Sequence, residues 1–299
     1  MKKILLITNA GGLPSQIQAL KDFTTTINAE STAHEFSFCT VQELLFSITD
    51  QGISIRLKNR ELHEICDMLH LRNVNRFADY ANAIRLYAQY HGLVLVNTID
   101  ATLPYYGKVS QAFLMALNGI QTPYLVSSPS NQTLTKALRV QPFMYPVVIK
   151  HNEGIKGQDN YLASDIDEAR AILQQAKQDF VLQPFIPNEG ELRVLRYGKY
   201  LSPLVFKKQA IAGTHLNNTS QGGSVTLLKT ELVDAATLKQ ALLAAELMGR
   251  DIAGIDVLLG SDGDHYILEV NTTPSIATGA FMNEKRRLYD EFFENEMEL

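Results

Sequence analysis

The sequence predicts a mixed α/β (α+β) protein in three parts, and three patterns along the chain support this. Short apolar strands alternate with amphipathic helices through residues 1–100, which favours a mostly parallel sheet. The alternation continues through residues 101–184, whereas residues 185–299 are richer in the hairpin signals of an antiparallel sheet. With 299 residues, 45% of them hydrophobic, the chain can form two or three domains with their own cores.

The N-terminal part begins with KILLIT, an apolar run that is too short for a signal peptide or a membrane span and reads as a buried strand. Apolar residues at intervals of three and four predict a helix further along. The elements expected here are a strand at 2–8, a helix from about residue 15, strands at 34–40 and 53–59, a helix at 76–90 and a strand at 92–97.

The central part begins with a helix that Lys108 opens and that ends at Gly119, and Asp165 is placed to cap a later helix. The other elements expected here are strands at 122–128, 145–150, 160–164 and 179–186 and helices at 133–140 and 165–176. In the C-terminal part we expect a hairpin at 191–208 around Gly198, a helix at 235–249, a second hairpin at 254–271 and a final helix at 283–297.

Composition argues against several classes of function. The net charge of −5 gives no electrostatic footprint for nucleic acid, and no apolar segment is long enough for a membrane span. Cys39 and Cys66 lack the spacing of a zinc site, so we expect two buried free thiols in a reducing compartment. These features predict a cytoplasmic protein that binds neither nucleic acid nor membrane.

The second hairpin carries a candidate metal site. Asp256 lies within its first strand, while Glu269 and Asn271 lie two residues apart in the second and therefore share a face. Pairing of the strands would bring three oxygen ligands together, a set that Mg²⁺ favours when substrate phosphates supply further ligands. The alternative is a solvated acidic edge of the hairpin.

A candidate phosphate loop follows Lys150, which ends an apolar strand. Gly154 and Gly157 would let backbone N–H groups approach phosphate oxygens, and the lysine would add a positive charge. The pattern is not a Walker motif, and a flexible surface hairpin is the alternative. The Gly-containing turn at 11–14 fits a dinucleotide fold only weakly, since the full fingerprint is missing.

The strand at 179–186 could line an adenine slot, with Glu191 placed for a ribose hydroxyl and Arg193 on the same strand face for phosphate or carboxylate. Lys207 and Lys208 end the partner strand, whose alternation turns one of them inward and the other to solvent.

In this order, the motifs resemble the ATP-grasp carboxylate–amine ligases over about residues 90–280, in particular the RimK-like branch that includes ribosomal-protein glutamate ligases. The segments that carry the resemblance are YYGK with Lys108, VVIK with Lys150, VLQPFIPNEGELRV with Glu191 and Arg193, HLNNTSQGG with Asn218, and DIAGIDVL with ILEVNTTP. Four departures stand out: Gly107 replaces an acid, Gln183 and Pro184 replace a common Glu, Leu216 replaces an arginine, and TTPSI replaces the usual Ser-Pro-Gly.

The resemblance implies an ATP-grasp fold, in which a parallel α/β subdomain precedes two subdomains whose antiparallel sheets sandwich ATP. It also implies a ligase of the acid–amino-acid type: a carboxylate takes the γ-phosphate, and an amine displaces it from the acyl phosphate, leaving an amide, ADP and phosphate. The expected cofactors are ATP and Mg²⁺, with two ions and with Mn²⁺ as a substitute. The expected partners are a carboxylate substrate, an amine substrate and, as a possibility, further copies of the chain.

The resemblance assigns catalysis to Arg193 and Lys150 and metal binding to Asp256, Glu269 and Asn271. The expected nucleotide contacts are Lys108, Lys150, Gly154, Gly157, Gln183, Pro184, Phe185, Glu191, Lys207 and Asn218. Three other functions stay open at this point: a non-catalytic ATP-binding module of the same fold, an ATP-dependent phosphotransferase, and a dinucleotide-dependent oxidoreductase.

Overall fold

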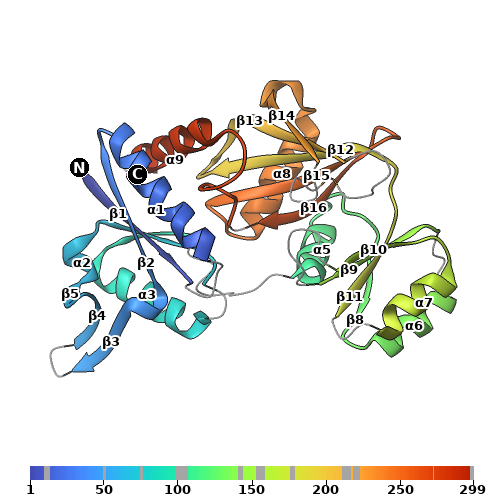
Figure 1. The fold of residues 1–299 in the computed structure, drawn as a ribbon, viewed down its shortest axis with the longest axis horizontal. Helices are drawn as coiled ribbons and strands as arrows, with labels where there is room; N and C mark the ends of the chain where they lie inside the picture. The colour runs from blue at the N-terminus through green and yellow to red at the C-terminus, as the bar shows by residue number, and fades with distance from the viewer. Residues whose placement is uncertain are drawn as a thin grey trace.

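A computed structural model of the chain describes residues 1–9, 14–49, 52–74, 77–97, 107–140, 144–152, 159–175, 179–210, 217, 223–271 and 273–296. It shows a mixed α/β fold with one four-stranded parallel sheet and three antiparallel sheets (Figure 1). Within the described residues, no helix is both long and apolar enough to span a membrane.

The N-terminal sheet has the strand order β2-β1-β6-β7, and all of its neighbouring strands are parallel, as predicted. Its elements are β1 (Lys2–Thr8), α1 (Pro14–Glu30), β2 (His34–Thr40), β6 (Met68–Leu71), α3 (Ala78–His91) and β7 (Val94–Val96). Ile4 and Leu6 of β1 pack with α1, whereas Leu5 and Ile7 pack with α3. Burial on both faces explains why β1 is a continuous apolar run.

A small antiparallel sheet, β3-β4-β5, lies between β2 and β6 in the sequence. It consists of β3 (Leu44–Thr49), β4 (Gly52–Leu57) and β5 (Arg60–Glu61), flanked by the 3₁₀ helix η1 (Val41–Glu43) and the short helix α2 (Leu62–Ile65). The sequence predicted β4 but neither β3 nor β6. β6 has only four residues, and β3 follows η1 directly, with no loop to separate the two elements.

The central sheet has the order β10-β9-β11-β8 and is antiparallel throughout. Its elements are β8 (Val126–Ser128), α6 (Asn131–Val140), β9 (Val147–His151), β10 (Asn160–Ala163), α7 (Ile166–Gln175) and β11 (Phe180–Pro184). Both helices pack on one face, through a core that includes Leu134, Ile149 and Leu173. The predicted cap of α7 is confirmed, since Asp165 Oδ1 accepts hydrogen bonds from the amides of Asp167 and Glu168, each at 2.9 Å.

The C-terminal sheet has the order β14-β13-β12-β15-β16 and is also antiparallel. Its elements are β12 (Asn188–Tyr197), β13 (Tyr200–Gln209), β14 (Ser224–Lys229), the 3₁₀ helix η4 (Thr230–Leu232), α8 (Ala235–Leu247), β15 (Ile252–Gly260) and β16 (His265–Asn271). Alanines of α8 pack on one face of the sheet, together with Leu192, Val194 and Ile255. Both predicted hairpins and the helix between them are confirmed.

Two helices pack outside the part of the chain in which they occur. Met115 of α5 (Lys108–Leu117) joins the core of the C-terminal sheet, and Tyr289 and Phe293 of α9 (Met282–Glu296) join the N-terminal core. In Figure 1, α9 in red lies beside α1 in blue. The domain boundaries at residues 100 and 184 therefore remain predictions. Hydrophobic cores of the structure contain residues from both sides of each boundary.

Candidate active site

Strand alternation sorts the side chains of the C-terminal sheet onto two faces. Leu192 and Val194 of β12 turn toward α8, so Glu191 and Arg193 leave the opposite face. The strand register then places Lys208 beside Glu191, Asp256 beside Arg193, Glu269 beside Asp256, and Asn271 beside Gly254. We call this surface the polar face of the sheet.

Arg193 and Asp256 form the centre of the polar face. The Arg193 guanidinium donates to Asp256 twice, through Nε to Oδ1 and through Nη2 to Oδ2, the second at 2.6 Å. Lys208 Nζ lies 2.9 Å from Asp256 Oδ1 and also contacts Glu191 Oε1. Asp256 and Glu191 thus lie beside two cations in a largely buried setting, where an unpaired charge would be costly.

The pKa values of Glu191 and Asp256 are shifted in opposite directions. Burial raises the pKa of Glu191, to about 8, and the neighbouring charge of Asp256 acts in the same direction, while Lys208 opposes them. Burial would also raise the pKa of Asp256, but Arg193 and Lys208 outweigh it and hold that pKa below its ordinary value. Asp256 therefore remains the ionised member of the pair.

The candidate metal ligands meet as predicted. Asn271 Nδ2 lies 3.0 Å from Asp256 Oδ2 and 3.2 Å from Glu269 Oε1, so one amide bridges both carboxylates. Among the described residues, no group of three or more His, Cys, Asp and Glu side chains is arranged to hold a metal ion. Two carboxylates and one amide nevertheless suit Mg²⁺, since it takes its other ligands from water and phosphate.

Two lysines of residues 101–184, Lys108 and Lys150, are directed toward the polar face. Lys108 Nζ, in the first turn of α5, lies 3.8 Å from Glu269 Oε2 and 3.2 Å from the carbonyl oxygen of Asn152. Lys150 in β9 leaves the sheet face opposite α6 and α7. Burial lowers the pKa of Lys150, and the charges of Glu269 and Glu191 oppose this, so the lysine lies within electrostatic reach of the polar face.

The predicted adenine contacts lie in β11 of the central sheet and directly after it. Gln183 is buried and pairs with Val148, which places it on the face that also carries Lys150. Pro184 pairs with Val147, and the amide of Phe185 donates to the carbonyl oxygen of Pro146 at 2.9 Å. This segment leads directly into β12 and thus connects the two sheets.

Three features of the site differ from the sequence prediction or were missed by it. Lys207 pairs with Leu192, so its side chain projects from the face of the sheet that α8 covers. Lys208 is therefore the lysine that reaches the carboxylates. Lys208 could have been predicted from the sequence. In a simple hairpin around Gly198, strand alternation places it on the same face as Glu191 and Arg193. Gln111 was missed: its amide bonds both backbone groups of Val270, at 3.2 and 2.7 Å, and so attaches α5 to β16.

Several predicted residues lie outside the described part of the chain. They are Gly154 and Gly157 of the phosphate loop, Leu216 and Asn218 of the polar loop, and residues 11–13 of the first turn.

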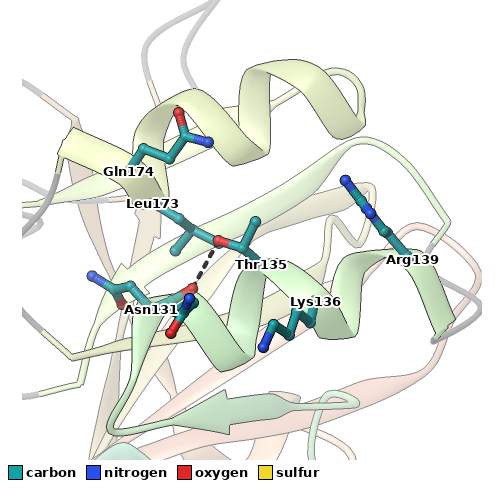
Figure 2. A pocket seen from close by; sticks show the side chains of 7 residues that line it. Asn131, Thr135, Lys136, Arg139, Leu173 and Gln174 are labelled. Atoms are coloured by element: carbon teal, nitrogen blue, oxygen red, sulfur yellow. Dashed lines mark hydrogen bonds between the residues drawn. The ribbon is translucent and has the colours of Figure 1, made fainter.

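A surface hollow lies elsewhere. Figure 2 shows it between α6 and α7, where Thr135 Oγ1 donates to the carbonyl oxygen of Asn131 at 2.7 Å and where Lys136, Arg139 and Gln174 contribute to the lining. Because α6 and α7 cover the face of the central sheet opposite Lys150, the hollow does not belong to the polar face.

Comparison with known proteins finds relatives that cover most of the chain. A model of the RimK-like ATP-grasp domain matches residues 107–285. A probable alpha-L-glutamate ligase of Aliivibrio fischeri (strain MJ11) is 27% identical over 272 residues, which cover 89% of this chain and 88% of the relative. Probable alpha-L-glutamate ligase 1 of Pseudoalteromonas atlantica (strain T6c / ATCC BAA-1087) is 27% identical over 277 residues, covering 89% and 88%.

Two solved structures share the fold over nearly the whole chain. The ATP-grasp ligase PsnB, complexed with minimal precursor, superposes with a TM-score of 0.69 at 17% identity, covering 99% of this chain and 100% of its own. D-alanyl-alanine synthetase A from Vibrio cholerae O1 biovar eltor str. N16961 superposes with a TM-score of 0.68 at 15% identity, covering 98% and 96%.

Proposed function

This chain belongs to the RimK-like ATP-grasp family, and we propose that it is a ligase that uses L-glutamate as one of its substrates. It is an enzyme of ATP-dependent amide-bond formation, as its ligase relatives are. Glutamate is supported by relatives that are named probable alpha-L-glutamate ligases. The observation that carries the proposal is the polar face, where two carboxylates and an amide lie beside Arg193 and within reach of two lysines of the central unit.

The chemistry proceeds in two balanced steps. A substrate carboxylate oxygen attacks the γ-phosphorus of ATP, which forms an acyl phosphate and releases ADP. The nitrogen of an amine then attacks the acyl carbon, the C–O bond to phosphate breaks, and an amide, inorganic phosphate and a proton result. Phosphoryl transfer requires charge neutralisation and alignment more than covalent help from the protein.

We assign the binding of ATP to residues on both sheets. Lys108 and Lys150 would neutralise phosphate oxygens from the central side, because Lys108 Nζ lies 3.8 Å from Glu269 Oε2 and the charges of Glu269 and Glu191 act on the pKa of Lys150. Glu191 would accept a hydrogen bond from a ribose hydroxyl. Gln183 and Phe185 would contact adenine at the strand that links the two sheets.

We assign to Arg193 the stabilisation of negative charge on the acyl phosphate and on the tetrahedral intermediate that follows. Two of its N–H groups hold Asp256, which fixes the plane of the guanidinium before any substrate binds. Lys208 donates to the same carboxylate, through Oδ1.

Asp256, Glu269 and Asn271 would hold Mg²⁺. When bound there, Mg²⁺ supplies positive charge to the terminal phosphates of ATP. We propose two ions at the site and Mn²⁺ as a functional substitute. A cytoplasmic location and assembly into a homo-oligomer remain predictions.

Product analysis tests the proposal. The purified chain is incubated with ATP, Mg²⁺, L-glutamate and a panel of amino acids and short peptides, and ADP, AMP, phosphate and amide are measured together. We expect ADP, phosphate and amide in equal amounts, with turnover dependent on glutamate.

Other products would identify the rival functions. ADP with phosphate retained on glutamate would indicate a phosphotransferase, and binding of ATP without any product would indicate a binding module. Equal amounts of AMP and pyrophosphate would contradict the acyl-phosphate route. Amide formation that does not require glutamate would contradict the proposed substrate.

A further inference from the structure

Lys285 is a buried cation close to the polar face. It lies in the first turn of α9 with 8% of its surface exposed. Its Nζ donates to the carbonyl oxygen of Thr278 at 2.9 Å and lies 5.3 Å from the centre of the Phe206 ring. These contacts fix the ammonium group through a backbone oxygen and an aromatic face, neither of which carries a negative charge.

Arg193 is the charged neighbour of Lys285. Phe206, which packs under the Lys285 ammonium, is the β13 partner of Arg193 in the strand register. Arg193 uses Nε and Nη2 for Asp256, while its Nη1 lies over Gly254, 3.0 Å from the position of a Cβ there. Burial lowers the pKa of Lys285 to about 8, and the positive charge of Arg193 acts in the same direction.

Lys285 differs in this respect from the other cations of the site. Lys208 contacts two carboxylates, and Lys108 lies within 3.8 Å of Glu269. Among the described residues, by contrast, no carboxylate lies within 4.0 Å of Lys285 Nζ. Lys285 is therefore a buried ammonium group without a counter-ion of its own, and such a charge is costly unless an anion joins it.

The sheet order separates Lys285 from the lysines assigned to ATP. Lys108 reaches the polar face at the edge strand β16, whereas Lys285 lies over β13, and the strands β12 and β15 with the Arg193–Asp256 pair run between them. An anion at Lys285 would therefore meet Arg193 from the side opposite to the metal ligands.

We propose that Lys285 and Arg193 together bind a carboxylate group of the substrate. The inference rests on the proposed function and deepens it, since it assigns the carboxylate end of the reaction to a particular pair of side chains. Lys285 is a binding and positioning residue in this scheme, and Arg193 is shared between the two ends of the site. A substrate with two carboxylates fits best, because one can react while another remains bound.

Kinetics of two Lys285 variants test the role of the charge. Lys285→Met keeps most of the buried aliphatic stem and removes the charge, and Lys285→Arg keeps the charge. We expect Lys285→Met to raise the KM for L-glutamate by about tenfold or more while the KM for ATP stays within about twofold, as loss of one charge-assisted hydrogen bond implies. Lys285→Arg should recover part of this loss. The matched control is Arg287→Met, an exposed cation on the same helix, which should behave as the wild type.

A binding measurement without turnover separates this inference from the proposed function. Glutarate is titrated calorimetrically into the wild type and the variants in the presence of ADP and Mg²⁺. We expect the wild type to bind glutarate and Lys285→Met to bind it about tenfold more weakly or worse. Equal binding by both, or no binding by the wild type, overturns the inference. If glutarate binds through Lys285 but glutamate supports no turnover, the proposed substrate is wrong and the anion site stands.

Discussion

Asp256 is held by two cations in this structure, Arg193 through two N–H groups and Lys208 through its ammonium. These contacts keep the carboxylate ionised in a buried position, where an unpaired charge would be expensive. They also mean that a metal ion would share Asp256 with side chains that already bind it. Glu269, whose side chain is 30% exposed, is the carboxylate more open to a newly arriving cation.

Glu269→Gln should therefore separate metal binding from folding. The substitution keeps the shape of the side chain and removes its charge, so we expect turnover to fall by about a hundredfold. The thermal midpoint should stay near that of the wild type. Mg²⁺-dependent binding of ADP, followed by calorimetry, should weaken as well.

The control for this variant is Glu246→Gln, an exposed position on α8. Wild-type affinity for ADP and Mg²⁺ in Glu269→Gln would remove Glu269 from the metal site.

Gly254 is required by the guanidinium that lies over it. A Cβ at this position would lie 2.9 Å from Arg193 Cδ and 3.3 Å from Pro274 Cβ. Because a flexible side chain can move more easily than the sheet, Gly254→Ala should displace Arg193 and leave the fold intact. We expect kcat to fall by about tenfold or more, as misplacement of a catalytic group does.

A double-mutant cycle with Arg193→Lys checks the cause. If both substitutions act through the position of the guanidinium, the two effects on kcat will be far from additive. Independent, additive losses would contradict this explanation of Gly254.

At the scale of single elements, Glu61 joins β5 to β4 and to α3. Its carboxylate accepts hydrogen bonds from Ser54, from Arg56 at 2.7 Å and from Tyr87 at 2.9 Å. Burial opposes ionisation, but these bonds outweigh it and lower the pKa of Glu61 from 4.5 to about 2. A carboxylate with a lowered pKa stabilises the fold above its ordinary pKa and loses that contribution as it becomes protonated.

We therefore expect the wild type to be more stable than Glu61→Gln at pH 7, and the difference to shrink as the pH falls from about 5 toward 2. Thermal midpoints of both proteins across this range measure the effect. A difference that is constant over the whole range would show that ionisation of Glu61 is not its source.

The faces of the strands show how much of the site could be predicted from the sequence. Strand alternation is local, so it placed Glu191 with Arg193 and Glu269 with Asn271 on common faces, and the structure confirms both pairs. The choice of Lys208 over Lys207 could also have been made from the sequence, because Lys208 falls on the face of Glu191 and Arg193 in a simple hairpin around Gly198. Lys285 could not be found in this way, because its place beside Phe206 depends on where α9 returns to the molecule.

At the scale of the whole molecule, contacts between distant segments join the N-terminal and C-terminal sheets. Asn97 follows β7, and its side-chain Oδ1 accepts a hydrogen bond from the backbone amide of Ile252 at 2.9 Å. The backbone amide of Asn97 donates to Asp251 Oδ2 at 2.7 Å. Arg72, after β6, donates to the carbonyl oxygen of Pro274 at 3.0 Å. The Asn97 bonds join the end of β7 to the start of β15, and the Arg72 bond joins the end of β6 to the segment after the candidate metal ligand Asn271.

Phe293→Ala tests the contribution of α9 to this arrangement. Phe293 is fully buried among residues of both sheets, so its removal should cost about 3–5 kcal/mol of unfolding free energy. Phe113→Ala is the matched control, since Phe113 is 63% exposed and should change stability little. Chemical denaturation measures both variants, and equal small effects would show that the α9 contact contributes little.

The position of α9 also has a consequence for folding. Phe36 belongs to β2, whereas Tyr289 and Phe293 belong to α9, and the three aromatic rings pack together in one core. Contacts this distant in the sequence form slowly, because a long stretch of chain must close before they can contribute. Until α9 docks, the apolar residues that it covers remain exposed, and a chain in this state is prone to aggregate.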